Sequence, residues 1–503
     1  MQVALCFAYF AVLLLLAMYG LHRSHLVITC LRHAKKLRAL REGAPRLPLD
    51  TGAASLPHVT IQLPLYNEAT VVARLLEMTS RMAYPREKLE IQVLDDSTDE
   101  SRQMARAKVA QLRNDPPAVA DGTRPDWDGE LDIVYIHRVD RTGYKAGALE
   151  NGTKQAKGEF LMVFDADFVP TPSIILDLVH HFTAPKVGMV QARWGHLNRD
   201  YSVLTRVQSM MLDGHFVVEH IARNRSGRFF NFNGTAGIWR RATIVDAGGW
   251  QHDTLTEDMD LSFRAQLRGW RFVYVPEAVA PAELPCEMNS FKGQQFRWAK
   301  GSAQTAKKLL PMVMRANIPW KVKLEVLFHL TDNFAYLFLL VLAFLQLPNM
   351  ILRQEIARPE LLLLDVPLFA LTSGSIVMFY LTTHRALYGN LWEAVRRLPL
   401  MMALGIGLSL NNARAVVEGL IGRESEFVRT AKHGVTLSSE SWTKKKYRAS
   451  KELFSWLEVG IGLYFVATIV AAGFIGAWTS IPFLVLFMVG FLYVGSLSLH
   501  QAR

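Results

Sequence analysis

Two aspartates separated by one residue follow a short apolar run in GEFLMVFDAD, residues 158–167. Placing Asp165 and Asp167 beside apolar strand residues costs desolvation free energy unless a cation joins them. Their hard oxygen ligands suit Mg²⁺ or Mn²⁺, which take one or two carboxylates and complete the shell with substrate phosphates. The pair predicts a metal site for a phosphorylated substrate, and the alternative is an acidic strand-to-helix turn.

A second acidic pair, Asp95 and Asp96, closes the apolar run in KLEIQVLDDS, residues 88–97. Aspartate is also a common N-cap and turn residue, so this pair by itself fits a turn equally well. Lys145, in GYKAGALENG, precedes the strand that ends in Asp165. Its ammonium group is suited to bind a diphosphate as a point charge, and a solvated surface lysine is the alternative.

A third acidic cluster lies in TLTEDMDLSFRAQLRGW, residues 254–270, ahead of an amphipathic helical pattern. Thr256, Glu257, Asp258 and Asp260 could simply fill the first turn of that helix, where acidic groups favour the helix dipole. On the same sheet as a metal-held diphosphate, however, a further carboxylate is what a general base for a hydroxyl nucleophile requires.

Large side chains with polar ends crowd FKGQQFRWAKGS, residues 291–302, just before the apolar C-terminal half. The spacing of Gln294 and Arg297 places both on one helical face, with Trp298 beside them. This favours an interfacial helix with one polar face. The alternative is an aromatic and basic belt at the membrane surface.

Short apolar runs that alternate with helical stretches between about 57 and 285 indicate the element that positions these residues. VTIQLPLYNE, KLEIQVLDDS, GEFLMVFDAD and VGMVQARW predict strands of a mostly parallel sheet covered on both faces. Ligands of such sheets bind at the carboxyl ends of the strands. Asp95, Asp96, Asp165 and Asp167 are therefore expected to gather at one edge.

Apolar runs at both ends of the 503-residue chain predict membrane spans around this domain. Residues 3–19 are uncharged and are followed by Arg23, Arg32 and further basic residues, which argues against a cleaved signal peptide and places the N-terminus outside. Four more spans are predicted near 326–347, 361–382, 453–474 and 478–498. The segment 398–421, between two basic loops, is predicted to lie in the interface.

The net charge of +11 fits juxtamembrane basic residues that face anionic lipid. Nucleic-acid binding is not predicted, because the sequence of the α/β part contains no basic stripe interleaved with aromatic residues. Cys6, Cys30 and Cys286 are too few and too scattered for a disulfide framework or a zinc site. We expect a reduced, cytoplasmic domain.

The ordered motifs LPLYNE, DDS, DAD, FNGTAG, TED and Q-x-x-R-W resemble those of a family-2 glycosyltransferase of the GT-A fold. The similarity extends from about 57 to 310 and is greatest to the membrane-integrated branch that makes cellulose, mannan and related glycans. KAGAL, GTAGIWRRATIVDAGGW and TEDMDLSFRAQLRGWRFVYV are closer still to the plant glucomannan and xyloglucan-backbone synthases and their bacterial relatives. The implied fold is an α/β, Rossmann-like GT-A domain between an N-terminal transmembrane helix and a C-terminal bundle of transmembrane and interfacial helices.

The resemblance also implies roles for individual residues. Tyr66 and Glu68 would border the nucleobase, Asp95 and Asp96 would hold the nucleoside, and Asp165 and Asp167 would reach the diphosphate through Mg²⁺ or Mn²⁺, supported by Lys145. Asp258 would be the catalytic base, with Glu257 and Arg297 beside it, and Gln294 and Trp298 would bind substrate. EFVRTAKHG, with Phe427, Thr430 and Lys432, resembles the gating loop of processive synthases, although arginine replaces the usual valine before Thr430.

The expected product is a β-1,4-mannan or glucan, extended by an inverting, processive transfer from UDP-glucose or GDP-mannose to a polysaccharide hydroxyl and passed through the bilayer. Alternatives are a non-processive lipid glycosyltransferase, as in ceramide glucosyltransferase, and a non-catalytic export subunit. The catalytic domain would face the cytoplasm, at the inner membrane of a bacterium or the Golgi of a plant-like cell. The expected divisions are a transmembrane helix (1–22), a basic linker (23–56), the GT-A domain (57–286), interfacial helices (287–323), a hairpin (324–383), an interfacial helix with the gating-like loop (384–452) and a second hairpin (453–503).

Overall fold

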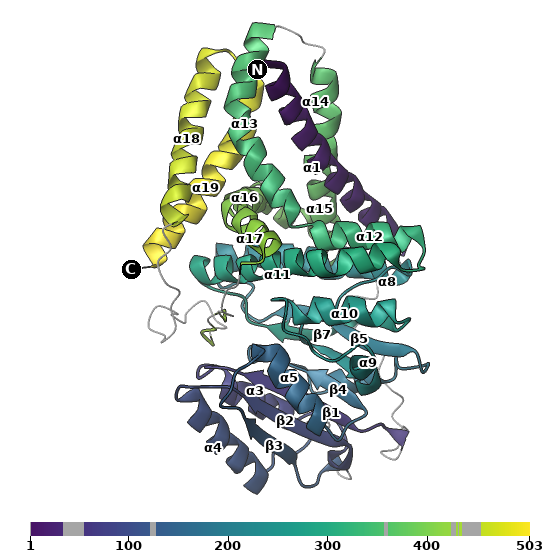
Figure 1. The fold of residues 1–503 in the computed structure, drawn as a ribbon. Helices are drawn as coiled ribbons and strands as arrows, with labels where there is room; N and C mark the ends of the chain where they lie inside the picture. Colours follow the sequence, from purple (N-terminus) through teal and green to yellow (C-terminus); the bar gives the residue numbers. More distant parts are fainter. Residues whose placement is uncertain are drawn as a thin grey trace.

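A computed structural model describes residues 2–33, 55–120, 127–356, 361–423, 429–430, 432–434 and 454–502. An α/β domain forms one half of the molecule and a bundle of long helices forms the other, with α11 (Met288–Arg315) lying between them (Figure 1). Most of the expected basic linker, Phe427 of the gating-like loop and most of the basic loop at 423–451 lie outside the described residues.

Seven strands form one mixed sheet in the order β3-β2-β1-β4-β6-β5-β7. β1 runs parallel to β2 and β4, and only β6 among the described strands is antiparallel to both of its neighbours. The strands are β1 (Val59–Leu65), β2 (Leu89–Asp95), β3 (Asp132–His137), β4 (Phe160–Val163), β5 (Val187–His196), β6 (Gly237–Arg240) and β7 (Arg271–Ala282).

Helices cover both faces of the sheet because its central strands carry apolar side chains on both sides. In β4, Phe160 and Met162 pack on one face, while Leu161 and Val163 pack on the other. The first face is covered by α3 (Val72–Ser80), α4 (Ser101–Asn114) and α6 (Ile174–Val179). The second is covered by α5 (Tyr144–Gln155), η4 (His215–His220), α8 (Ile221–Arg225), α9 (Arg241–Asp246) and α10 (Glu257–Leu267), with α7 (Val203–Gly214) leading into η4.

The four apolar runs form β1, β2, β4 and β5, which confirms the predicted strands and the mostly parallel sheet. Three further strands were not predicted. β6 begins with Gly237 and ends with Arg240, and β3 and β7 begin with the charged residues Asp132 and Arg271, so none of the three is a continuous apolar run. Pairing with neighbouring strands stabilises them, and pairing is a tertiary property that local sequence does not reveal.

Five described helices are long and apolar enough to cross a membrane. They agree in number and order with the five predicted spans, but the first continues to Leu31, the third continues to Tyr388, and the second begins later than 326. Residues up to Thr331 belong to α12 (Trp320–Thr331), and the chain turns at Asp332 and Asn333 before the apolar helix starts. The five are α1 (Gln2–Leu31), α13 (Phe334–Ile356), the broken helix α14 (Leu362–Phe369), η6 (Ala370–Gly374) and α15 (Ser375–Tyr388), α18 (Phe454–Phe474), and α19 (Ile481–Gln501) preceded by η7 (Trp478–Ser480).

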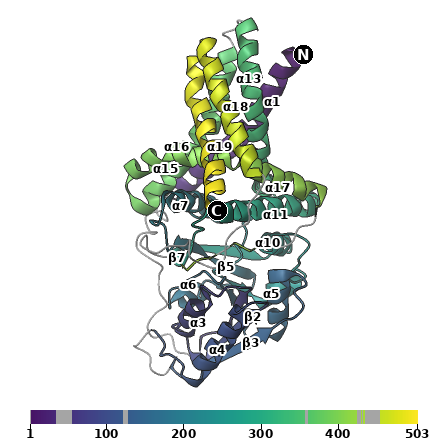
Figure 2. The same ribbon diagram turned by 90° about the vertical axis from the view of Figure 1, so that its left-hand side faces the viewer.

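The segment predicted to be interfacial forms two helices, α16 (Leu391–Gly407) and α17 (Ser409–Ile421), with a bend of 42° between them. α17 runs beside α11 rather than along the bundle (Figure 2). The ammonium group of Lys300 lies 3.2 Å from the carboxylate of Glu418, and both side chains are buried. α11 and α17 therefore form one layer between the bundle and the sheet.

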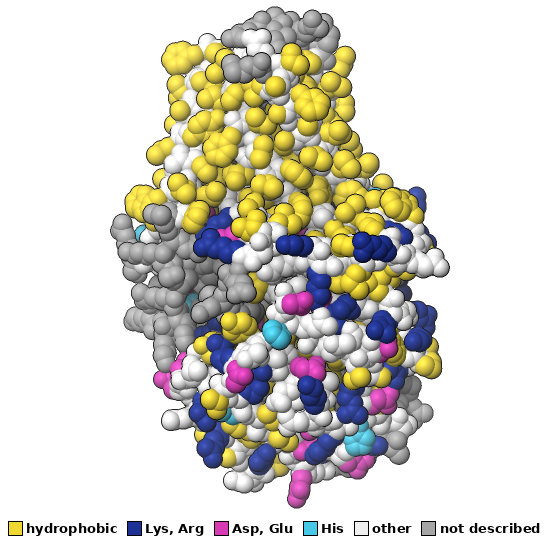
Figure 3. Space-filling view, viewed as in Figure 1, with side chains coloured by type: hydrophobic (Ala, Val, Ile, Leu, Met, Phe, Trp, Pro, Cys, Tyr) yellow, Lys and Arg dark blue, Asp and Glu magenta, His cyan; other side chains and the backbone are white. Residues whose placement is uncertain are grey.

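The outer surface changes character at this layer. Apolar side chains cover the helical bundle, whereas lysine, arginine and acidic side chains are scattered over the α/β domain (Figure 3). Exposed basic residues of α11 and α12, including Lys307, Arg315 and Lys321, lie at the boundary. This is the charge distribution of a protein whose bundle is in lipid and whose basic boundary contacts headgroups.

Close packing of α16 against α19 yields a test of the bundle. A Cβ atom added to Gly490 would lie 2.2 Å from the backbone oxygen of Ala403, so the helices must separate. We expect Gly490→Ala to reduce the free energy of unfolding by about 1–3 kcal/mol, measured as thermal unfolding in nanodiscs. The control is Gly460→Ala in α18, where an added Cβ meets no atom within 4 Å. Equal stability of the two variants would contradict this packing.

Candidate active site

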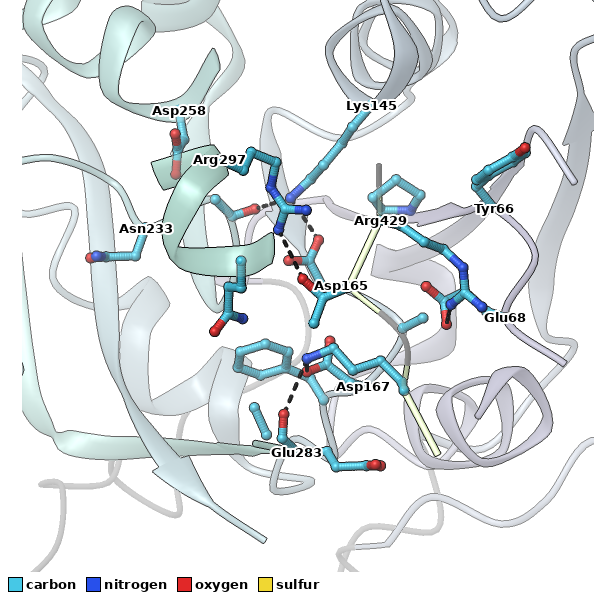
Figure 4. A pocket seen from close by; sticks show the side chains of 18 of the residues that line it. Tyr66, Glu68, Lys145, Asp165, Asp167, Asn233, Asp258, Glu283, Arg297 and Arg429 are labelled. Atoms are coloured by element: carbon cyan, nitrogen blue, oxygen red, sulfur yellow. Dashed lines mark hydrogen bonds and ion pairs between the residues drawn. The ribbon is translucent and has the colours of Figure 1, made fainter. Parts of the chain in front are cut away.

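A pocket of about 190 Å³ opens at the carboxyl ends of the parallel strands. Asp258 and Asn233 lie on one side of Lys145 and Asp165, and Tyr66 and Glu68 lie on the opposite side (Figure 4). Side chains from the α/β domain, from α11 and from the segment after α17 all contribute to it. Among its lining residues are Tyr66, Glu68, Asp96, Lys145, Asp165, Asp167, Asn233, Glu257, Asp258, Glu283, Gln294, Arg297, Trp298, Arg429, Thr430 and Lys432.

Each aspartate of the DAD motif is paired with a lysine. The Lys145 ammonium lies 2.6 Å from the Asp165 carboxylate, and the Lys432 ammonium lies 2.5 Å from that of Asp167. Burial alone would lower the pKa of Lys145, but Asp165 and Glu257 outweigh it, so this pKa is raised. Burial likewise would lower the pKa of Lys432, but Asp167 outweighs it, so this pKa is also raised. Both lysines are therefore cations in the ligand-free pocket.

The DAD carboxylates fit a divalent metal that completes its shell elsewhere. Within the described part of the chain, no group of three or more acidic, histidine or cysteine side chains is arranged so that it could hold a metal ion. Asp165 and Asp167 would therefore supply two oxygen ligands, and the remaining positions would be left for phosphate and water oxygens, as is usual for Mg²⁺. The backbone N–H of Asp165 donates to Thr235 Oγ1 at 2.9 Å, which fixes where the motif leaves β4.

Asp258 faces the pocket from the first turn of α10. Burial, with a contribution from Glu257, raises its pKa to about 7 although Lys145 lowers it. The backbone at Gly234 approaches the Asp258 carboxylate closely. A Cβ added to Gly234, whose φ is +79°, would lie 3.0 Å from Asp258 Oδ2. A carboxyl group with this pKa can exchange a proton near neutral pH, which a general base requires.

The capping interpretation of the third acidic cluster is confirmed in part, because Glu257, Asp258 and Asp260 do lie in the first turn of α10. Thr256 precedes α10 but makes no side-chain capping bond, and its hydroxyl lies 3.1 Å from that of Thr305 in α11. Asp260 points away from the pocket and pairs with Arg264 and Lys308. The cluster is therefore divided, with Glu257 and Asp258 at the pocket and Asp260 in a buried ion-pair network.

Parallel pairing of β2, β1 and β4 brings the two acidic strand ends to one edge, as predicted. Asp96 lines the pocket, and Arg138 binds its carboxylate at 2.8 and 2.5 Å. Asp95, in contrast, does not line the pocket. Its carboxylate is buried and accepts from the Tyr135 hydroxyl at 2.6 Å and the Ser97 N–H at 2.9 Å.

At the opposite end from Asp258, the Arg141 guanidinium stacks on Tyr66, 3.3 Å from the ring centre. Glu68 lies 2.6 Å from Arg429, which is the arginine in place of the usual valine of the gating-like loop. Burial raises the pKa of Glu68 to about 7, although Arg429 lowers it. This ion pair ties the segment after α17 to the loop after β1.

α11 supplies the remaining predicted residues. Arg297 Nη2 donates to Thr430 Oγ1 at 3.3 Å, and Gln294 and Trp298 also line the pocket. Close contact of α11 with α10 sets their position: a Cβ added to Gly301 would lie 2.5 Å from the Thr256 side chain. Gln294 and Trp298 also line a second, larger cavity toward the membrane bundle.

Sequence reasoning did not assign roles to several residues of this pocket. Two of them lie in motifs that could have indicated a role: Asn233 belongs to FNGTAG, and Arg429 replaces the usual valine of the gating-like loop. Arg141 and Glu283 had no such signal, because a single charged residue in a loop is usually solvated. The backbone oxygen of Glu283 accepts from Lys432 at 3.1 Å, and its carboxylate accepts from the His433 N–H at 2.9 Å.

Proteins of similar sequence identify the family of this chain. Residues 57–301 match the family described as "Glycosyltransferase like family 2". The chain is 35% identical over 411 residues to glucomannan 4-beta-mannosyltransferase 2 of Arabidopsis thaliana, covering 78% of this chain and 71% of that protein. The chain belongs to the family-2 glycosyltransferases. Glucomannan 4-beta-mannosyltransferase 1 of Oryza sativa subsp. japonica is 32% identical over 437 residues, covering 82% of this glycosyltransferase and 77% of the relative.

Among solved structures, the GT-A-like fold of this glycosyltransferase is similar to that of the mannosyltransferase PcManGT from Pyrobaculum calidifontis, determined in complex with GDP-Man and Mn²⁺. The TM-score is 0.50 at 18% identity, and the match covers 83% of this chain and 100% of the other. At this identity the similarity shows the fold alone. The expected fold class and the expected enzyme class are confirmed by these comparisons.

The Lys432–Asp167 pair predicts a competition in the ligand-free enzyme. A divalent ion that binds Asp167 must first displace the lysine ammonium, so we expect Lys432→Ala to bind Mn²⁺ roughly tenfold more tightly. The measurement is free Mn²⁺ by electron paramagnetic resonance during titration of the protein without nucleotide. Lys108→Ala, which removes a surface pair with Glu77, is the control. Unchanged Mn²⁺ affinity in Lys432→Ala would show that Asp167 is not a ligand.

Proposed function

We propose that this glycosyltransferase moves a mannosyl group, with inversion, from a nucleotide-diphosphate mannose to the 4-hydroxyl of a growing β-glycan. The observation that carries the proposal is the position of Asp258. It borders both the pocket with the lysine-paired DAD motif and the larger cavity that extends into the bundle. A base at the junction of two cavities is suited to join a donor in one to an acceptor in the other. The names of the plant relatives support mannose and the β-1,4 linkage.

Asp258 takes the proton of the acceptor hydroxyl as its oxygen attacks the anomeric carbon. The bond from that carbon to the diphosphate oxygen breaks on the opposite face, and the electron pair leaves with the diphosphate. Lys145 and Arg297 are fixed cations at the end of the pocket where this negative charge develops. Preorganised positive charge in a site shielded from water is a large source of transition-state stabilisation.

Asp165 and Asp167 would hold Mg²⁺ or Mn²⁺, which supplies Lewis-acid stabilisation of the diphosphate. Tyr66 and Glu68, with Arg141 and Arg429 beside them, lie at the far end of the pocket from Asp258 and suit the nucleobase. Asp96 suits the ribose. Asp95 supports this end indirectly, because its carboxylate is already engaged by Tyr135 and Ser97.

The larger cavity supports a processive reaction coupled to passage through the bilayer. It has a volume of about 500 Å³, and its lining runs from Asp258 and Trp298 to residues of α1, α13, α16 and α19. A polymer extended at Asp258 would therefore grow into a space enclosed by the membrane helices.

A lipid acceptor is the second candidate, and the lining of the larger cavity favours it. In the membrane bundle this lining includes the aliphatic side chains of Leu339, Leu342, Ile376 and Leu486, which suit an alkyl chain better than sugar hydroxyls. A glycolipid would place its sugar at Asp258 and its tail among these residues. The donor experiment below separates the two candidates.

We infer that the catalytic domain faces the cytoplasm. Arg23 and Arg32 lie at the domain end of α1, and Lys307, Arg315 and Lys321 are placed on the same side of the bundle. The positive-inside rule assigns such a basic boundary to the cytoplasmic leaflet.

A donor panel tests the proposal. In nanodiscs with Mn²⁺, we expect radiolabel from GDP-mannose, rather than from UDP-glucose, UDP-galactose or UDP-N-acetylglucosamine, in ethanol-insoluble material that an endo-β-1,4-mannanase releases. Asp258→Asn should abolish this label but leave nucleotide binding intact. Label confined to the organic extract would identify a lipid acceptor, and activity retained by Asp258→Asn would remove that residue from its role as base.

The raised pKa of Asp258 predicts an acid limb in the pH dependence of transfer. The base must be ionised, so activity is present above a pKa of about 7 and falls about tenfold for each pH unit below it. The measurement is kcat/KM for the acceptor between pH 5.5 and 9 at saturating donor and metal. A rate that is flat from pH 5.5 to 8 would contradict a base with this pKa.

A further inference from the structure

A π-helix forms one wall of the larger cavity beside the active site. η4 continues α7 for the six residues His215–His220 before the chain returns to the α-helical form in α8. Short π-helical turns widen the helix at the expense of ideal hydrogen bonding and occur frequently at functional sites. His215 and Glu219 of this turn both line the cavity.

A chain of polar contacts holds Glu219 in place. His215 Nδ1 donates to Glu219 Oε2 at 2.9 Å, and Arg223 Nη1 donates to the same oxygen at 3.0 Å. Within the described residues no hydrogen bond reaches the other carboxylate oxygen, Oε1. Burial alone would raise the pKa of Glu219, but Arg223 and His215 outweigh it and keep this pKa well below its usual value. Glu219 therefore presents an ionised oxygen to the cavity.

The same chain reaches the catalytic base through Asn233. Asn233 Nδ2 donates to His215 Nε2 at 2.8 Å, and its Oδ1 accepts from His220 Nε2 at 2.5 Å. Asn233 lines both cavities and precedes Gly234, the residue that approaches Asp258 closely. The polar wall is thus continuous with the place where the acceptor hydroxyl must lie.

A structural role alone explains another carboxylate of this network but not Glu219. Glu325 bonds with His22 and Arg223, and its side chain is 2% exposed, as expected of a residue that ties helices together. The Glu219 side chain is 21% exposed, and it borders the cavity. Trp298 and Gln294 of α11 line the same cavity. An indole together with ionised and amide hydrogen-bonding groups is suited to hold a hexose ring by its apolar face and its hydroxyl groups.

We propose that His215, Glu219 and Asn233 form the polar half of an acceptor subsite, in which Glu219 accepts hydrogen bonds from hydroxyl groups of the hexose unit next to Asp258. The subsite fixes which acceptor hydroxyl reaches the base. This inference rests on the proposed transfer to a sugar hydroxyl, and it holds whether that sugar belongs to a polymer or to a glycolipid.

The test separates transfer from hydrolysis of the donor. Full-length protein in nanodiscs receives GDP-mannose and Mn²⁺ with or without β-1,4-mannotetraose, and transfer to the oligosaccharide and release of free mannose are both measured. Loss of one hydrogen bond to a charged group is expected to reduce kcat/KM for mannotetraose about 10- to 100-fold in Glu219→Gln, mainly through KM. The KM for GDP-mannose in hydrolysis should change less than twofold.

Glu393→Gln is the matched control, because Glu393 also pairs with arginines, Arg199 and Arg397, but lines neither cavity. His215→Gln is the second variant and is expected to raise the KM for mannotetraose in the same direction. An equal loss of transfer and hydrolysis in both variants would assign the wall a structural role only, and unchanged transfer would overturn the subsite. If the unaltered enzyme neither transfers nor hydrolyses GDP-mannose, the proposed donor is wrong, and the same comparison is made with the donor that the panel identifies.

Discussion

The need to neutralise buried carboxylates organises the active site. Four carboxylates meet at one pocket, because parallel strands end there and α10 begins there: Asp165, Asp167, Glu257 and Asp258. Like charges at such short range repel one another. The positive charge of Lys145, in α5, offsets this repulsion. Arg297 and Lys432 also offset it, from outside the α/β domain. Since charges in a partly buried site gain more from pairing than surface charges do, these contacts hold α11 and the segment after α17 against the sheet. The α/β domain and the membrane bundle are therefore joined at this pocket.

α11 is the structural centre of the molecule for the same reason. One face carries Gln294, Arg297 and Trp298 to the pocket, and the other sides carry buried lysines to the bundle, where Lys292 pairs with Glu458 of α18 and Lys300 with Glu418 of α17. An unpaired buried charge is costly, so each pair fixes the helix against a different partner. α11 therefore links the membrane helices to the pocket that Gln294, Arg297 and Trp298 line.

The cavity beyond Asp258 combines two chemical environments. Near Asp258 it is lined by His215, Glu219 and Asn233, which suit hydroxyl groups, and farther into the bundle by leucine, isoleucine and phenylalanine. This gradient follows the membrane itself, because the boundary layer tolerates charged networks and the bilayer interior does not. An acceptor bound as proposed would meet polar groups near Asp258 and apolar groups farther into the bundle.

The sequence by itself determined the elements whose signals are local. Short apolar runs predicted β1, β2, β4 and β5, and apolar runs of membrane length predicted the spans. The ordered motifs indicated the family and the edge of the sheet where the acidic residues gather. Only the tertiary structure decided contacts between distant segments. Pairing with neighbouring strands made strands of β3, β6 and β7, and the fold turned Asp95 away from the pocket while Asp96 remained in it. The Lys432–Asp167 and Arg429–Glu68 pairs join segments more than 250 residues apart. Hydrophobic periodicity and turn chemistry are properties of neighbouring residues, whereas charge pairing and strand pairing depend on where the completed fold brings the chain together.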